Sequence, residues 1–258
     1  QSLELNVSTL TLYVGDSETL NLKVSPENAS TSGIIWSTPE NFVSVTNDGK
    51  VTGLKEGITS ITVSTKDSKV SKSIVVKVES PLEINPSSTT LSKDESIKLE
   101  AVYLNDYAKG QQLEWRSSDE SIVKVDQNGK ATAIKSGKAT INVVDKGNTF
   151  SASCEINVNV SVENIILDTS NIKLPKGKEF QLNTTISPED AVNKNVKWSS
   201  SNSFIVSVNE SGLIKGIKIG NATITATTED GGFKASCEVE VTSTENIEYT
   251  PWEESENW

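Results

Sequence analysis

The residue types that most often carry out chemistry in proteins are scarce in this chain. Its 258 residues include no histidine, which removes the commonest general base and metal ligand and any histidine-activated nucleophile. Carboxylate pairs can hydrolyse glycosides, but only where a walled cleft holds them. We expect Asp119, Glu120 and Asp126 in loops or on solvated strand faces. The sequence therefore predicts no catalytic residue, no metal site and no cofactor.

The two cysteines are the remaining candidates for covalent chemistry. Cys154 and Cys237 lie 83 positions apart, each between Ser and Glu. This spacing matches a repeat described below, so the two cysteines occupy equivalent positions in consecutive domains. A disulfide requires its Cα atoms to lie within about 7 Å of each other. We therefore expect two small buried thiols that pack as hydrophobic residues.

Three tryptophans mark an internal repeat. Trp36 and Trp115 lie 79 positions apart, and Trp115 and Trp198 lie 83 apart. A turn glycine returns at intervals of 80 and 83, at Gly49, Gly129 and Gly212. A register that holds over a whole module predicts a tandem array of small domains.

We expect the domain boundaries where the repeat restarts. The predicted segments are module 1 at 1–80, module 2 at 81–160, module 3 at 161–242, and an acidic tail or truncated start of a further segment at 243–258. Almost no free linker separates the modules, and Pro81 restricts the first junction. The sequence thus predicts modules arranged end to end with limited bending.

Each module is predicted to be all-β. Apolar residues alternate along segments such as 19–24, 58–63 and 139–144, and no segment carries them at helical spacing. Asp, Asn or Ser precedes a turn glycine between alternating segments, as in a tight hairpin. Several short strands in roughly 80 residues suit a two-sheet immunoglobulin-type sandwich. Trp36, Trp115 and Trp198 are then core residues on the third strand, facing the opposite sheet.

The repeated motif resembles a known family. Its clearest copy runs Trp198-Ser-Ser-Ser-Asn202, Val206-Ser-Val208, Gly212, Gly216 and Gly220-Asn-Ala-Thr-Ile-Thr225. This pattern is similar to the bacterial immunoglobulin-like group 2 (BIG2) repeat over residues 1 to about 242. The resemblance implies β-sandwich modules of secreted or surface-exposed bacterial proteins and of phage tail and capsid proteins. There such modules act as spacers, adhesive domains or carbohydrate-contacting decorations.

Composition agrees with an exported protein and excludes some partners. The formal net charge is −11, so the phosphate backbone of a nucleic acid would be repelled. No apolar stretch is long enough to cross a bilayer, so we expect no membrane insertion. The chain contains no methionine, even at position 1, which suggests a processed product or an excised fragment. We expect an extracellular, cell-surface or virion location.

Aromatic residues outside the repeat are the candidates for partner or ligand contact. Tyr103 and Tyr107 belong to a loop unique to module 2, although Tyr103 could equally turn inward at the end of its strand. Tyr249, Trp252 and Trp258 lie in the tail. Module 2 also departs from the pattern at Asp94, where the other copies have Gly15 and Gly177, and at Ala133, where they have glycine.

The tail echoes the start of a module. Residues 243–247 (Ser-Thr-Glu-Asn-Ile) are similar to residues 161–165 (Ser-Val-Glu-Asn-Ile), which open module 3. One interpretation is a loose cut end. The other is a strand at 246–252 that pairs with an edge of another copy, anchored by its tryptophan. We favour the loose end, because chain termini are usually poorly ordered.

The sequence as a whole predicts a non-enzymatic, extracellular, rod-like spacer or adhesive segment of a bacterial or phage surface protein. Its partner would be a host-surface protein or a carbohydrate. One alternative is a self-assembling filament, tail or shell subunit that associates through the C-terminal strand. A second alternative is a set of carbohydrate-binding accessory modules of a secreted enzyme.

Overall fold

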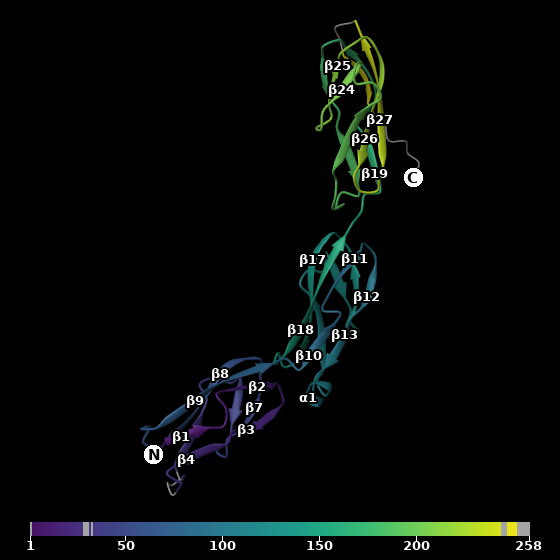
Figure 1. The fold of residues 1–258 in the computed structure, drawn as a ribbon. Helices are drawn as coiled ribbons and strands as arrows, with labels where there is room; N and C mark the ends of the chain where they lie inside the picture. Colours follow the sequence, from purple (N-terminus) through teal and green to yellow (C-terminus); the bar gives the residue numbers. More distant parts are fainter. Residues whose placement is uncertain (1, 28–30, 32, 244–246, 252–258) are drawn as a thin grey trace. The chain divides into compact units, whose positions relative to one another are not determined.

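The computed structural model describes residues 2–27, 31, 33–243 and 247–251. The chain divides into two compact units, residues 1–158 and residues 159–258. Modules 1 and 2 together form the first unit, and module 3 lies in the second (Figure 1). Almost all regular structure is β, as the alternating apolar pattern predicted.

Every module contains the same series of strands. Module 1 has β1 (Ser2–Leu5), β2 (Thr9–Tyr13), β3 (Ser17–Thr19), β4 (Leu22–Ser25), β5 (Ile34–Ser37), β6 (Val43–Val45), β7 (Lys50–Gly53), β8 (Gly57–Thr65) and β9 (Ser71–Glu79). Module 2 has β10 (Leu82–Asn85), β11 (Ser88–Ser92), β12 (Ser96–Lys98), β13 (Glu100–Tyr103), α1 (Asp106–Lys109), β14 (Leu113–Ser117), β15 (Val123–Val125), β16 (Lys130–Ala133), β17 (Gly137–Asp145) and β18 (Ser151–Asn159). Module 3 has β19 (Asn164–Leu167), β20 (Thr169–Pro175), β21 (Glu179–Gln181), β22 (Thr184–Ser187), β23 (Val196–Ser200), β24 (Val206–Val208), β25 (Leu213–Gly216), β26 (Gly220–Thr228), β27 (Lys234–Thr242) and, after it, β28 (Glu248–Pro251).

The strands form equivalent sheets in each module. The orders β2-β9-β8-β5, β11-β18-β17-β14 and β28-β20-β27-β26-β23 describe the larger sheets, and β3-β7-β6, β12-β16-β15 and β21-β25-β24 the smaller ones. Two-stranded pairs β1-β4, β10-β13 and β19-β22 complete the modules. The predicted strand at 19–24 is therefore two strands in different sheets: Leu20 N–H still donates to Gly49 O at the end of the β3–β7 pairing, and β4 begins at Leu22 and pairs with β1. The sandwich of immunoglobulin type is confirmed.

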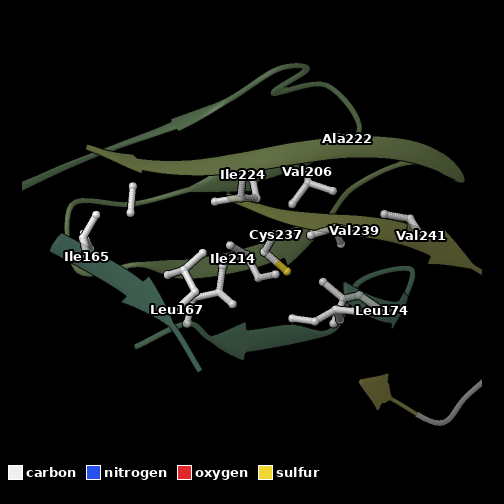
Figure 2. Close-up of a cluster of buried hydrophobic side chains, with 13 residues drawn as sticks. Ile165, Leu167, Leu174, Val206, Ile214, Ala222, Ile224, Cys237, Val239 and Val241 are labelled. Carbon is white, nitrogen blue, oxygen red and sulfur yellow. The ribbon is translucent and has the colours of Figure 1, made fainter. Parts of the chain in front are cut away.

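The core of each module comes from strict alternation along its long central strands. In β26, the side chains of Ala222, Ile224 and Ala226 point inward and are buried, while their neighbours are at least partly exposed. Figure 2 shows the resulting cluster in module 3, where residues from β19, β20, β24, β25, β26 and β27 meet. Burying each such aliphatic side chain contributes about 1.5–3 kcal/mol.

The repeat tryptophans lie against the hairpin glycines. A Cβ atom added to Gly129 would come within 2.9 Å of Trp115 Cζ2, and the same added atom on Gly212 within 2.5 Å of Trp198 Cζ2. Both glycines have a positive φ, 80° and 83°, which a hairpin turn of this kind requires. Trp115 is buried, whereas Trp198 and Trp36 are partly exposed at the edge of their cores. The repeated Trp and Gly are thus one packing contact made in each module.

The cysteines occupy equivalent places on the final long strands. Cys154 of β18 is paired with Ile141, and Cys237 of β27 is paired with Ile224. Both thiols are free and fully buried. Burial raises the pKa of Cys154, and burial together with the charges of Asp168 and Glu238 raises the pKa of Cys237 to about 12. Such thiols are poor nucleophiles and metal ligands.

Candidate functional site

The first half of the candidate site is a tight turn between β2 and β3 of module 1. Gly15 has φ of +92°, and its N–H donates to Gly53 O at 2.9 Å. Asp16 N–H closes the turn on Tyr13 O at 3.0 Å. Asp94 in module 2 also has a left-handed φ, +65°, so the turn conformation is kept where the glycine is not.

The second half is the loop unique to module 2, which contains the short helix α1. Asn105 precedes the helix in an extended conformation, and its Oδ1 accepts a hydrogen bond from Ala108 N–H at 3.0 Å. Ala108 is buried, which holds the helix against its own module. Lys109 binds Asp106 at 2.8 Å on the exposed side, and this hydrogen bond and the lysine charge lower the pKa of Asp106. The loop is therefore an ordered platform for Tyr107.

The two halves contact each other directly. Asn105 Nδ2 donates to Val14 O at 3.0 Å and to Asp16 Oδ1 at 2.9 Å. The Tyr107 ring covers Gly15 so closely that an added Cβ would lie 2.3 Å from Tyr107 Cγ. Gly15 therefore admits the ring as well as forming the turn.

A second group of contacts lies beside the first. Glu56 N–H donates to Thr149 O at 3.0 Å, and Glu56 Oε1 accepts from Ser151 N–H at 2.5 Å. Both partners belong to the hairpin between β17 and β18. Phe150 of this hairpin is 2% exposed and meets the Tyr107 ring edge to face, with centroids 6.4 Å apart. Module 1 therefore holds module 2 through two loops at once.

The structure places the predicted contact residues in three environments. Tyr107 is 43% exposed and contacts module 1 of its own chain, while Tyr103 ends β13 and is partly buried. Tyr249 is 55% exposed and packs against Phe180 with centroids 5.5 Å apart. Trp252 and Trp258 lie outside the described residues. Sequence reasoning missed Asn105 and Glu56. Asn105 lies in the loop that is unique to module 2, whereas Glu56 precedes Gly57, which keeps the repeat, and gave no such signal.

The tail contains a strand where the sequence favoured a loose end. β28 pairs antiparallel with β20, with Tyr249 opposite Ile172 and Glu248 opposite Lys173. Lys173 Nζ lies 3.3 Å from Glu248 Oε2. The reason is local complementarity, because Phe180 offers Tyr249 an aromatic surface. The edge of β20 is thus covered by a strand of the same chain.

Neither a metal site nor a membrane-spanning helix is found in the part of the chain that the structure describes. No three His, Cys, Asp or Glu side chains gather there in a way that could hold a metal ion. No helix among these residues is both long enough and apolar enough to cross a membrane.

The sandwich topology and the repeated Trp and Gly contact define a chain of immunoglobulin-like modules. The family model for the bacterial Ig-like domain (group 2) matches residues 1–76, 80–156 and 161–239. The chain therefore belongs to the bacterial Ig-like (group 2) family, with three tandem copies, as the resemblance implied. Modules of this family are generally non-catalytic.

Relatives of the chain come from bacteria and phages. An uncharacterized protein of Clostridium acetobutylicum is 38% identical over 163 residues, which are 60% of this chain and 17% of that protein. An alpha-L-arabinofuranosidase of Bifidobacterium longum is 52% identical over 61 residues, 24% of this chain and 6% of the enzyme. An Ig-like virion protein of Serratia phage KSP90 is 27% identical over 198 residues, 72% of this chain and 76% of the phage protein. The chain thus spans less than a fifth of the length of the first two.

Proposed function

We propose that the chain is a non-catalytic spacer or adhesive segment of a bacterial or phage surface protein, located outside the cell or on a virion. The observation that carries this proposal is the contact between modules 1 and 2. Asn105 and Tyr107 hold one loop of module 1, and Glu56 joins a second loop to the hairpin of module 2. Contacts at two neighbouring loops, which Tyr107 and Phe150 connect, restrain bending and twisting between these modules, as a spacer requires and a flexible linker does not provide.

The relatives support the same role. The virion protein of the phage is matched over most of its length, whereas the arabinofuranosidase is matched over a small part. A module that accompanies such different proteins is expected to position them and to leave chemistry to other domains. A host-surface protein or a carbohydrate remains the proposed partner of an adhesive segment.

Two alternatives make different use of the same chain. A self-assembling subunit would donate β28 to another copy, whereas this structure pairs β28 with β20 of its own module. A carbohydrate-binding accessory module is supported by the name of the arabinofuranosidase relative. Mass in solution over a concentration series, with and without residues 243–258, tests the first, and binding to arabinose-containing polysaccharides tests the second.

A distance measurement tests the spacer proposal directly. Lys50 and Lys130 are exposed residues at equivalent positions in modules 1 and 2. Spin labels on Lys50→Cys and Lys130→Cys, with Cys154 and Cys237 replaced by Ala, should give one narrow distance distribution. The same labels in Tyr107→Ala/Asn105→Ala should give a broad one. A broad distribution in the chain with an intact contact would refute a stiff spacer.

A further inference from the structure

Module 3 has a face equivalent to the one through which module 1 holds module 2. We define this terminal face by residues 176–178, Phe204 and 216–219. Gly177 matches Gly15, with φ of +85° and an N–H that donates to Gly216 O at 2.7 Å. Lys176 N–H donates to Thr242 O at 3.0 Å, just as Val14 N–H donates to Glu79 O at 3.1 Å. The final strand of each module therefore ends beside the equivalent turn, so the chain leaves modules 1 and 3 at the same place on this face.

The two faces differ in what covers them. In module 1, Val14 is buried and Gly15 lies beneath the Tyr107 ring. In module 3, Lys176 and Gly177 are exposed, and no described atom lies within 4 Å of a Cβ placed on Gly177. The turn that admits an aromatic ring in module 1 is formed in module 3, and no described residue covers it there.

Large apolar side chains are exposed in the segments next to Gly216, which this turn contacts, and next to Ile205. Phe204 is 83% exposed, Ile219 is 59% exposed and Ile217 is 43% exposed. They belong to one surface, because Ile217 N–H and Lys218 N–H both donate to Ile205 O, next to Phe204. Exposed apolar clusters of this kind mark interaction sites.

The other modules show that Phe204 and Ile219 are not required by the fold, whereas Ile217 has the apolar counterparts Leu54 and Ile134. Repeat spacing places Asn41 and Ser121 at the position of Phe204, and Glu56 and Ser136 at the position of Ile219. Glu56 is one of the residues that hold module 2. Module 3 thus carries apolar contact groups where module 1 has a polar docking contact.

The charge at the equivalent turn is negative in module 1 and positive in module 3, which indicates the charge that a docked partner should carry. Lys178 stands in module 3 where Asp16 accepts a hydrogen bond from Asn105 in module 1. Exposed Lys176 and Lys218 add positive charge nearby. An occupant should therefore present a carboxylate at the position of Asn105, which would still cap its helix and would pair with Lys178.

We propose that the terminal face of module 3 docks a further Ig-like module joined to it in the same polypeptide. This module carries an aromatic side chain at the position of Tyr107 and a carboxylate at the position of Asn105. Residues 243–247, which echo the opening of module 3, are its connection. β28 follows these residues and pairs with the edge of β20 in this chain.

The experiment appends a module of known docking chemistry to the face. Residues 80–158 replace residues 243–258, so that a second copy of module 2 follows Thr242 as module 2 follows Glu79. The appended copy carries Asn105→Asp. Chains ending at Thr242 provide the control for loss of β28. The readout is amide hydrogen exchange in residues 203–206 and 217–219, together with the NMR shift of the Gly177 Hα protons.

We expect exchange in these residues to slow by about tenfold relative to the control, because docking adds an opening step to their exposure. The Gly177 protons should shift upfield under the appended tyrosine ring. Tyr107→Ala in the appended copy should remove the shift, and an unmodified Asn105 there should reduce the protection. Phe204→Ser/Ile219→Ser, which restores the residues of module 2, should reduce it as well.

Equal exchange in the fused and control chains would overturn the proposal. If residues 203–206 and 217–219 stay protected when the appended copy carries Tyr107→Ala, the claim that its aromatic ring packs on Gly177 would be wrong. The spin labels at Lys50 and Lys130 report on the contact between modules 1 and 2 and not on the terminal face of module 3. The spacer proposal can therefore fail while this docking proposal stands, and the docking proposal can fail while the spacer proposal stands.

Discussion

Gly15 and Gly177 are the same turn in two modules, yet they have different surroundings. Both have a left-handed φ, +92° and +85°, and both donate to the glycine that ends a strand of the smaller sheet. Tyr107 covers Gly15, whereas no described residue covers Gly177. The left-handed turn is therefore a feature of every copy of the repeat, whereas the aromatic contact is made only at the junction of modules 1 and 2. Residues that repeat are informative about the fold, and positions where one copy differs are informative about contacts between modules.

The largest expected effect tests whether the two compact units are energetically separate. Trp115→Ala should destabilise module 2 by about 3–5 kcal/mol, because it removes a buried indole and uncovers Gly129. Trp198→Ala should cost less in module 3, since that side chain is partly exposed. Hydrogen exchange measured by mass spectrometry would report each unit separately.

The same measurement would also show whether the two compact units unfold independently. In Trp115→Ala, strands β20, β26 and β27 should keep the protection that they have in the unmodified chain. A parallel loss in both units would show that the units unfold together.

The second prediction compares the two glycines directly. Gly177→Ala should cost about 1–2 kcal/mol, the price of a left-handed conformation for an L-residue. Gly15→Ala should cost about 2–4 kcal/mol, because its Cβ also meets the Tyr107 ring. Urea denaturation followed by tryptophan fluorescence would measure both.

A double substitution separates strain from contact. In the Tyr107→Ala background, Gly15→Ala should cost no more than Gly177→Ala, because the clash is gone. Equal costs of the two single glycine substitutions would contradict the difference between the faces.

The third prediction concerns the hydrogen bonds at the junction. Asn105→Asp keeps the oxygen that caps α1 and loses the donor to Val14 O and Asp16 Oδ1. Removing the donor and placing a carboxylate beside Asp16 should cost about 1–2 kcal/mol. Asn105→Ala loses the cap as well and should cost more. Thermal unfolding of the 1–158 region, measured by circular dichroism, would rank them, and an Asn105→Asp chain as stable as the original would show that the donor contributes nothing.

The sequence predicted the fold because its signals are local and repeated. Alternation along residues 58–63 and 139–144 gave the long central strands, and the spacing of Trp36, Trp115 and Trp198 gave the modules. The break at Leu20 was missed, since a chain that crosses between sheets keeps its apolar alternation.

The candidate site was harder to predict for a physical reason. Tyr107 and Asp94 were both recognised as departures from the repeat, but the contact joins Tyr107 to Gly15, 92 positions earlier. The position of that ring depends on the capping of α1 by Asn105 and on its contacts with Gly15 and Phe150, which join residues far apart in the sequence. The sequence indicated a strand at 246–252 only as an alternative, and one that pairs with another copy. The pairing of β28 with β20 of its own module was missed because Phe180, which Tyr249 packs against, has Glu18 and Ile97 as counterparts in the other modules.

The smallest expected effect compares the two equivalent cysteines as the pH rises. The pKa of Cys237 is raised to about 12, mainly by burial. An unfolded thiol ionises near pH 8.5. The folded state therefore favours the protonated thiol, its contribution to stability is complete below about pH 8.5, and that contribution is lost as the pH rises toward 12.

At pH 9.5 module 3 should have lost about 1.4 kcal/mol relative to pH 7.5, because each pH unit above the unfolded pKa changes the free energy by about 1.4 kcal/mol. Cys154 should follow the same direction in module 2, since burial raises its pKa as well. The added charges of Asp168 and Glu238 act only on Cys237, so module 3 should keep losing stability to a higher pH than module 2 does. Unfolding of Cys237→Ala and Cys154→Ala at both pH values provides the matched controls, and a pH dependence that survives Cys237→Ala would assign the loss to other groups.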